Sequence, residues 1–292
     1  MKKKKKISIT GANSYIGINL INFYTSKKVY VRAFCRNPKK LIKIFPKNKY
    51  LEIKKYSFSD KIIDFSGTVQ VIHLAHERTS LSRKNFLVDP NLIACENLVK
   101  NAVNYKIKKV IYLSSILAHK NTKSQYGKSK FDCEKIFQNK KFYILRLGFV
   151  FGGIQKGIYK QLMKSFCSSS IFPIIFPNKI INPLHIDDLS ELLLKSDVMN
   201  QTDIPYISKI KTDINLKFFF SRLAFKTLNK KLYFLHLPSN LLYFLTYFLG
   251  YYSKIFNLIF ERVAGLASLQ NKIKKVKECN FVFSKTEDFF DG

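Results

Sequence analysis

Three residues near the middle of the chain have the types and the spacing for acid–base chemistry. Tyr126 and Lys130 form a Y-x-x-x-K pair, and Ser115 lies eleven residues before the tyrosine, at the end of an apolar run. On a helix, residues four apart share a face, so the phenol and the ammonium are predicted to point the same way. An ammonium beside a phenol favours the ionised form of a tyrosine. Tyr126 is therefore predicted to exchange a proton with a substrate hydroxyl or carbonyl, and Ser115 to hydrogen-bond the same oxygen.

A glycine turn close to the first residue predicts a nucleotide-binding loop. Residues 10–17 read TGANSYIG, with Gly11 and Gly17 in place and Ser14 where a middle glycine is common. Such a turn after a strand lets backbone N–H groups approach a pyrophosphate, and the helix that follows presents its positive N-terminus. An ordinary turn between a strand and a helix is the alternative interpretation.

The second predicted strand ends in a base where an NAD site usually has an acid. Residues 33–38 read AFCRNP and contain no carboxylate to bind the ribose hydroxyls of adenosine. Arg36 has instead a planar guanidinium, which pairs well with a 2′-phosphate. The cofactor is therefore predicted to be NAD or NADP, and Arg36 favours NADP, with a chance base in a Lys-rich chain as the alternative.

These residues need a scaffold that brings separate strand ends together. In the first 150 residues short apolar runs alternate with helical patterns, which predicts right-handed crossovers and a doubly wound, parallel α/β sheet. Beyond that point the pattern is less regular, with four prolines followed by a helical, aromatic-rich tail. We expect strands at 6–9, 29–35, 69–74, 110–114 and 142–146, and helices at 15–25, 90–104 and 126–137.

The composition excludes several classes of protein. The chain has 292 residues, of which 47% are hydrophobic, so it can bury a sizeable core and is not globally disordered. Its five cysteines form no C-x-x-C pair, which argues against a disulfide framework or a zinc module and fits the reducing cytoplasm. The formal charge of +32 comes mainly from scattered lysines and from only 7 arginines. We attribute it to compositional drift rather than to nucleic-acid binding.

Targeting and membrane signals are weak. Lys2 to Lys6 imitate the basic start of a signal peptide, but no long apolar segment follows them. The most apolar stretch, 241–252, is shorter than the roughly 20 residues that span a bilayer. We expect a buried helix there. The alternative is an aromatic helix on a membrane surface beside Lys-rich segments, which would make the protein a peripheral membrane protein.

The order of these features is that of a known family. The chain resembles the extended short-chain dehydrogenase/reductases of the NAD-dependent epimerase/dehydratase family over nearly its whole length. The resemblance implies a Rossmann-type NAD(P)-binding domain over 1–165, with 183–200 returning to it, and a smaller, mainly helical nucleotide-sugar-binding part over 166–292. The markers are TGANSYIG at 10–17, VIHLA at 71–75, NLIACENL at 91–98, LSS at 113–115, YGKSK at 126–130, LR at 145–146 and HIDDL at 185–189.

The resemblance also implies roles for individual residues. Ser115, Tyr126 and Lys130 would be the catalytic trio, with Ser115 also touching the substrate. Arg146 and Lys156 are assigned to the substrate, although Arg146 is equally suited to a structural ion pair. The implied cofactor contacts are Gly11, Asn13, Ser14, Tyr15, Ile16, Gly17, Arg36, Leu74, Ala75, Tyr126 and Lys130.

Downstream features narrow the resemblance to a substrate class. Three features, LRLGFVFG at 145–152, the Lys156-Gly157 pair and ERVAGL at 261–266, are similar to those of bacterial enzymes that epimerise or reduce C4 of UDP-linked N-acetylated 6-deoxy sugars for surface polysaccharides. The resemblance implies a nucleotide-sugar substrate, a homodimer and a cytoplasmic location. A catalytically inactive NAD(P)-binding sensor or scaffold of the same fold is the alternative, because a fold alone does not establish activity.

Two pairs of residues invite other interpretations. His73 and His76 have metal-binding side chains, but no third ligand accompanies them, and we predict no metal site. Asp187 and Asp188 resemble an acid/base pair. We expect instead that one of them is the N-cap of a helix over 189–195.

Overall fold

The computed structural model describes residues 6–77, 89–195, 204–210, 212–240, 254–270 and 275–291. The apolar stretch at 241–252, for which a buried helix is predicted, lies outside the described residues. Among the helices that are described, none is long and apolar enough to cross a bilayer.

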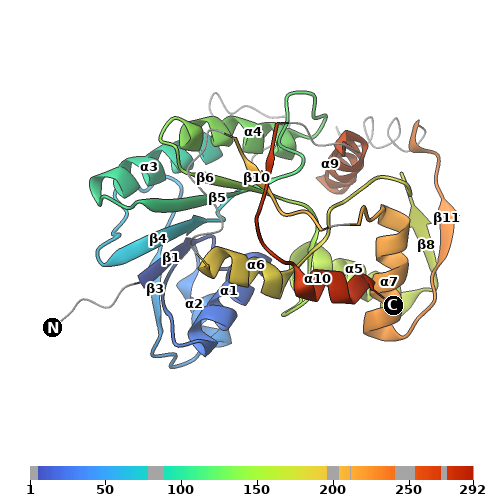
Figure 1. Ribbon diagram of the computed structural model, residues 1–292, viewed down its shortest axis with the longest axis horizontal. Coiled ribbons are helices and arrows are strands. Elements are labelled where there is room, and N and C mark those ends of the chain that lie inside the picture. The colour runs from blue at the N-terminus through green and yellow to red at the C-terminus, as the bar shows by residue number, and fades with distance from the viewer. Residues whose placement is uncertain are drawn as a thin grey trace.

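A parallel sheet of eight strands forms the centre of the molecule, with helices on both faces (Figure 1). The strands are β1 (Lys6–Thr10), β2 (Tyr30–Cys35), β3 (Leu51–Lys55), β4 (Thr68–His73), β5 (Lys109–Ser115), β6 (Tyr143–Leu147), β10 (Tyr206–Ile207) and β12 (Lys277–Glu278). Their order across the sheet is β12-β10-β6-β5-β4-β1-β2-β3. The predicted doubly wound parallel sheet is therefore confirmed, and each predicted strand and helix of the first 150 residues ends within one residue of its expected bounds.

The chain changes direction across the sheet beside β1. The strands β2 and β3 follow on one side of β1, whereas β4, β5 and β6 lie on the other side. Where the strand order reverses in this way, the loops after the two neighbouring strands run in opposite directions. They leave a crevice at the carboxyl ends of those strands. Thr10, His73 and Ser115 are the last residues of their strands at this edge. The fold thus brings the glycine turn and Ser115 to the same edge of the sheet.

Alternate residues of the central strands face the two helical layers. Ile72 and Ile111 pack into one hydrophobic cluster, whereas their neighbours Val71 and Val110 pack into the other. Because side chains alternate along a strand, a run that is apolar at every position buries both faces of the sheet. The helices of the first layer are α1 (Tyr15–Ser26) and α6 (Ile186–Leu194), and those of the second are α3 (Pro90–Asn104) and α4 (Gln125–Gln138).

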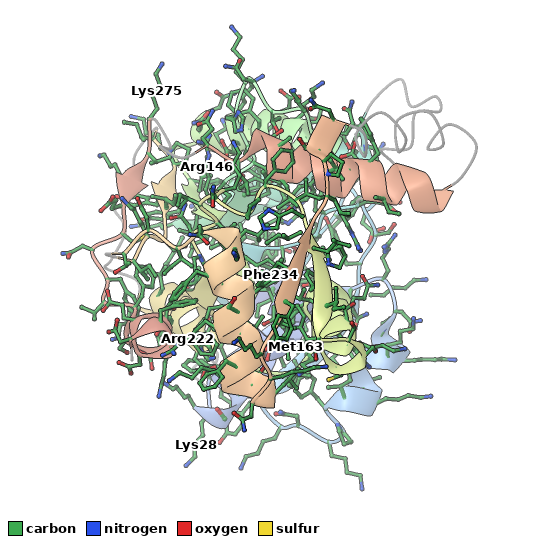
Figure 2. All side chains as sticks on the ribbon, turned by 90° about the vertical axis from the view of Figure 1, so that its right-hand side faces the viewer. Lys28, Arg146, Met163, Arg222, Phe234 and Lys275 are labelled. Atoms are coloured by element: carbon green, nitrogen blue, oxygen red, sulfur yellow. The ribbon has the colours of Figure 1, made fainter. Side chains whose placement is uncertain are left out.

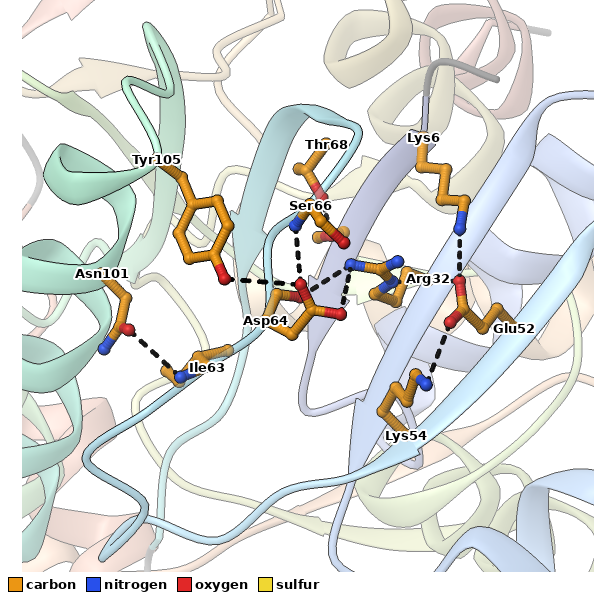
Figure 3. Close-up of polar contacts among 11 residues, drawn as sticks. Lys6, Arg32, Glu52, Lys54, Ile63, Asp64, Ser66, Thr68, Asn101 and Tyr105 are labelled. Atoms are coloured by element: carbon orange, nitrogen blue, oxygen red, sulfur yellow. Dashed lines mark hydrogen bonds and ion pairs between the residues drawn. The ribbon is translucent and has the colours of Figure 1, made fainter. Parts of the chain in front are cut away.

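Two elements near the edge of the sheet were missed by the sequence analysis. The helix α2 (Pro38–Ile44) is short and Lys-rich, and it begins at Asn37, whose side chain accepts a hydrogen bond from the Lys40 amide. The edge strand β3 has three charged and two apolar residues, so no apolar run marks it in the sequence. It is attached to β2 by Glu52, which accepts from Arg32 at 3.0 Å (Figure 3).

The part of the chain after β6 contributes both to the main sheet and to a smaller unit. β10 pairs with β6 and β12 pairs with β10, so segments beyond residue 166 extend the main sheet, and the division at 165/166 stays a prediction. A separate pair of parallel strands lies beside two helices, on the side of the molecule away from β3 (Figures 1 and 2). This unit contains β8 (Ile171–Ile174), β11 (Tyr233–His236), α5 (Gly157–Ser168) and α7 (Leu216–Leu228); the remaining elements are β7 (Val150–Phe151), β9 (Leu184–His185), α9 (Lys254–Ser268) and α10 (Ser284–Phe290).

The expected aspartate N-cap at the start of α6 is wrong. The helix begins earlier, at Ile186, because His185 Nδ1 accepts from the Asp187 amide at 3.3 Å. Asp188 is buried and accepts instead from the amide and the hydroxyl of Thr286, at 2.7 and 2.6 Å. Its carboxylate therefore attaches α6 to α10 rather than capping its own helix.

Candidate active site

Lys130 is a buried lysine on α4 whose ammonium points to the end of β5. Its Nζ donates to the Leu113 carbonyl at 2.8 Å and lies 4.5 Å from the centre of the Tyr112 ring. The same Nζ is 6.0 Å from the centre of the Tyr126 ring, one helical turn earlier. Little water screens a buried cation, so it strongly favours a neighbouring anion. The structure thus brings Lys130 and Tyr126 together in the arrangement that their spacing predicts.

Tyr126 and Ser115 come from the adjacent elements α4 and β5. The Tyr126 ring is half-buried and meets the His76 ring edge-on, with 5.0 Å between the ring centres. Ser115 ends β5, and its Oγ accepts from the Leu117 amide at 3.2 Å. Accepting this bond leaves the serine hydrogen available to donate. Ser115 can therefore act as a hydrogen-bond donor at the edge of the sheet.

Glu261 on α9 reaches the N-terminus of α4, the helix of Tyr126 and Lys130, and it was not predicted as a site residue. Its Oε2 accepts from the Gln125 amide at 3.0 Å and from the Ser124 hydroxyl at 3.2 Å. Burial raises the pKa of Glu261, and the hydrogen bonds from the start of α4 oppose this shift. A carboxylate is stabilising at this end of a helix. Glu261 therefore fixes the turn that carries Tyr126.

Arg146, a predicted substrate contact, lies in a buried ion pair. Its Nε and Nη2 donate to the two carboxylate oxygens of Glu134 at 2.8 and 2.6 Å. The Ser114 hydroxyl adds a third hydrogen bond to the same carboxylate at 2.6 Å. Of the two roles that the sequence leaves open, this geometry supports the structural one. Arg146 secures α4 to β6 behind the site.

The glycine turn packs tightly against the loop after β4. Gly11 has a φ of +68°, and a Cβ there would lie 2.7 Å from the Ala75 amide nitrogen. A Cβ on Gly17 would lie 2.8 Å from the backbone of Ala12. Ser14, in place of the middle glycine, is the N-cap of α1, and its Oγ accepts from the Gly17 amide at 3.1 Å. Only glycine fits at Gly11 and Gly17, as a backbone cradle for a pyrophosphate requires.

Two side chains join the glycine turn to the segment after β7. Tyr15 Oη donates to the Gly152 carbonyl and Lys156 Nζ donates to the Asn13 carbonyl, each at 2.5 Å. Burial, and then the charge of Lys40, lowers the pKa of Lys156. Among the described residues, the buried Oδ1 of Asn13 has no hydrogen-bond partner. The structure therefore places Lys156, predicted for the substrate, at the turn predicted for the cofactor, where an acceptor is left for a ligand.

The end of β4 lies beside this turn. His73 is buried between the Thr10 hydroxyl at 2.6 Å and the Cys95 thiol at 3.6 Å, and burial lowers its pKa to about 3. Both ring nitrogens have partners, so His73 is a structural residue. The next residue, Leu74, donates its amide to the Thr10 carbonyl at 3.3 Å, which places Ala75 against the turn. Within the described ranges, no group of three His, Cys, Asp or Glu side chains is arranged to hold a metal.

A carboxylate lies beside Arg36 after all, supplied by a different strand. Arg36 Nη1 donates to Glu77 Oε1 at 3.0 Å, and Glu77 follows the end of β4 by four residues. Asn91 holds the backbone of Glu77, because its Oδ1 accepts from the Glu77 amide at 2.7 Å and its Nδ2 donates to the Glu77 carbonyl at 3.2 Å. The residues at the end of β2 give no sign of this carboxylate, because it comes from the segment after β4. Arg36 is therefore not an unopposed positive charge.

Several solved structures share the fold but little of the sequence. The UDP-N-acetylglucosamine 4-epimerase from Bacillus cereus is 18% identical with a TM-score of 0.61, over 80% of this chain and 85% of its own. Pen from Bacillus thuringiensis is 18% identical with a TM-score of 0.63, over 80% and 78%. The dTDP-glucose 4,6-dehydratase DesIV from Streptomyces venezuelae, solved with NAD, is 12% identical with a TM-score of 0.64, over 80% and 85%. No curated protein matches the sequence.

A family model matches one continuous half of the chain. It describes the NAD dependent epimerase/dehydratase family and covers residues 7–152. This range contains the glycine turn, the strand that ends at Ser115, and both Tyr126 and Lys130. The arrangement of the turn fits the dinucleotide that the family uses. The chain belongs to the NAD dependent epimerase/dehydratase family.

Proposed function

We propose that the protein is an NAD(P)-dependent epimerase or reductase that acts at C4 of a nucleotide-activated sugar, of the UDP-N-acetyl class, for surface polysaccharide synthesis. Membership of the family and the likeness to a UDP-N-acetylglucosamine 4-epimerase support this proposal. The observation that carries it is the buried ammonium of Lys130, 6.0 Å from the Tyr126 ring at the crevice edge of the sheet. A sensor or scaffold would gain nothing from the cost of burying a cation beside a phenol.

The cofactor would lie along the glycine turn, with its nicotinamide towards α4. When bound, the nicotinamide supplies or accepts the hydride at the sugar carbon. Lys130 would hold the nicotinamide ribose, and Lys156 would add positive charge beside the pyrophosphate. The backbone of residues 11–17 would face the pyrophosphate, and Leu74 and Ala75 would line the cleft.

The protein's own groups would handle the proton. Oxidation at C4 removes a proton from the sugar hydroxyl, and reduction returns one to the oxygen. Tyr126 Oη would exchange this proton, and the charge of Lys130 would stabilise the phenolate. Ser115 would donate its hydrogen to the same oxygen, because its lone pair already accepts from the Leu117 amide. Epimerisation and reduction share these steps, since both pass through a 4-keto sugar.

The first test removes the phenolic hydroxyl. We expect Tyr126→Phe to lower turnover by about 10²- to 10⁴-fold, because general acid–base catalysis is lost. Dissociation constants for NADH and NADPH, measured by fluorescence titration, should stay within about twofold, since the cofactor's main contacts are on the glycine turn. Products would be identified by mass spectrometry from a panel of UDP-sugars and 4-keto-6-deoxy sugars, with and without NADPH.

Tyr105→Phe is the matched control, because Tyr105 is exposed at the C-terminal end of α3 and contacts Asp64 rather than the site. It should turn over substrate at the wild-type rate. Full activity in Tyr126→Phe would refute the assigned catalysis. Failure of the wild-type protein to bind either cofactor at millimolar concentration would favour the scaffold.

A further inference from the structure

The small sheet of β8 and β11 has one covered face. Phe172 lies opposite Phe234 in the strand register, and both are partly buried against the core. Phe172 also packs edge-on against Phe166 of α5 and Phe220 of α7, with 5.0 and 5.4 Å between ring centres. Because side chains alternate along a strand, the residues on either side of Phe172 and Phe234 point away from the core.

The outward residues form a continuous apolar strip. Ile171 is opposite Tyr233, and Pro173 is opposite Leu235, so the four side chains are neighbours across the two strands. Ile171, Tyr233 and Leu235 are 62%, 59% and 57% exposed. We call these four residues the outer ribbon face. Figure 2 looks towards this side of the molecule, with α7, β8 and β11 turned to the viewer.

The elements that frame the outer ribbon face carry positive charge and no negative charge. Residues 135–186 and 214–260, which contain α5, β8, α7 and β11, have no Asp or Glu, although the whole chain has 19. Compositional drift towards lysine adds bases, but it does not explain why acids are absent from these segments and present elsewhere. The exposed lysines of the four elements and the turns beside them are Lys160, Lys164, Lys217, Lys226 and Lys231.

Two of these lysines lie beside β11, one at the covered Phe234 and one at the outward Tyr233. Lys217 Nζ lies 5.9 Å from the centre of the Phe234 ring, and Lys231 Nζ lies 5.7 Å from that of Tyr233. The described carboxylates form their ion pairs with other bases, and none pairs with either lysine. The aliphatic stem of Lys231 can follow the apolar strip while its ammonium reaches beyond it, and Lys217 adds positive charge on the other face of β11.

We propose that the outer ribbon face docks on an anionic lipid surface. Ile171, Tyr233 and Leu235 would enter the boundary between headgroups and acyl chains, where a tyrosine buries its ring and keeps its hydroxyl wet. The surrounding lysines would approach the lipid phosphates. An apolar strip of this size binds a membrane only weakly by itself, so the apolar contacts and the lysine charges act together. A second copy of the chain is a poor occupant, because two such faces would bring like charges together.

Vesicle co-sedimentation of the full chain tests the proposal. We expect binding to phosphatidylcholine vesicles that contain about 30% phosphatidylglycerol, little binding to pure phosphatidylcholine, and weaker binding as salt rises from about 0.05 to 0.5 M. The pair Tyr233→Ser and Leu235→Ser removes the apolar signal, and the pair Lys217→Glu and Lys231→Glu reverses the local charge. Each should lower the partition coefficient at least about tenfold.

Matched controls separate docking from general adsorption of a basic protein. Ile62→Ser removes an apolar side chain that is 85% exposed in the connection between β3 and β4, and Lys100→Glu with Lys108→Glu reverses two exposed charges on and after α3. These variants should bind within about twofold of the wild type. Equal losses in controls and test variants would overturn the proposal, as would absence of binding to anionic vesicles, which would instead favour an acidic protein partner. Unchanged thermal melts and NADH titrations show that the variants are folded and keep the proposal independent of catalysis.

Discussion

An arginine pairs with a glutamate in two places that differ in burial. The pairs are Arg146 with Glu134 and Arg36 with Glu77. The first pair lies behind α4, with side chains 8% and 1% exposed and two hydrogen bonds between them. The second lies at the end of β2, with side chains 67% and 26% exposed and one contact of 3.0 Å. Removing one partner of a buried pair leaves an uncompensated charge, whereas water replaces the partner of an exposed one. Burial therefore decides which arginine is structural and which remains able to bind a ligand.

Arg32 and Glu52 form a third pair, in which the arginine is buried and the acid is partly exposed (Figure 3). The Arg32 side chain is 4% exposed and that of Glu52 is 32% exposed, and their contact is 3.0 Å. Lys6 and Lys54 also contact the Glu52 carboxylate, at 2.6 and 3.2 Å. Exposure averaged over the two side chains rises from Arg146 with Glu134, through Arg32 with Glu52, to Arg36 with Glu77, and the effect of neutralising the acid should fall in that order.

Neutralising Glu134 should have the largest effect on stability. We expect Glu134→Gln to lower the free energy of unfolding by about 3–5 kcal/mol, because the buried Arg146 guanidinium loses its counter-charge. Urea unfolding monitored by circular dichroism measures this loss. Glu96→Gln, at an exposed position on the neighbouring helix α3, is the control and should stay within about 0.5 kcal/mol. A loss below about 1 kcal/mol in Glu134→Gln would contradict the buried-charge argument.

Neutralising Glu52 should have a smaller, pH-dependent effect. Burial tends to raise the pKa of Glu52, but hydrogen bonds from Lys6, Arg32 and Lys54 outweigh this and lower it from 4.5 to about 2. A carboxyl group whose pKa is lower in the folded state stabilises the fold fully above its unfolded pKa and loses this contribution as the pH falls towards its folded pKa. Glu52→Gln should therefore cost about 1–2 kcal/mol at pH 7.

Urea unfolding of Glu52→Gln and wild type at a series of pH values measures this difference. It should shrink as the pH falls from about 5 to 2, where the wild-type carboxyl also becomes neutral. A gap that stays constant over this range would show that the carboxylate charge is not what Glu52 contributes.

Neutralising Glu77 should affect cofactor choice more than stability. We expect Glu77→Gln to change the free energy of unfolding by less than about 0.5 kcal/mol, because the pair is exposed. It should tighten NADPH binding relative to NADH by about three- to tenfold, since Arg36 is then free to pair with a 2′-phosphate. Fluorescence titrations of both cofactors give this ratio. If the ratio is also raised in the double variant Arg36→Ala and Glu77→Gln, Arg36 is not the selecting residue.

Local patterns account for the parts of the molecule that the sequence predicted correctly. Short apolar runs that alternate with helical patterns located the strands, and a spacing of four residues placed Tyr126 and Lys130 on one helix face. Both patterns can be recognised in the sequence because they involve residues that are close together along the chain. Glu77, Glu261 and Asp188 act on residues from distant segments, so no local pattern reveals their partners. The burial of Arg146 depends on the packing of α4 over β6, and the sequence accordingly left its role open between two alternatives.

Asn91 is a single buried amide that holds both ends of one connection. It bonds the backbone of Glu77 on one side and the Asp89 carboxylate on the other, at 2.8 Å from its Nδ2, and Asp89 also accepts a hydrogen bond from Ser129 beside Lys130. Because Glu77 follows β4 and Asp89 precedes α3, this one side chain sets the position of the end of that strand relative to the start of that helix. Loss of the Asn91 amide would therefore loosen the strand and the helix together, so this position is a hinge pin between β4 and α3.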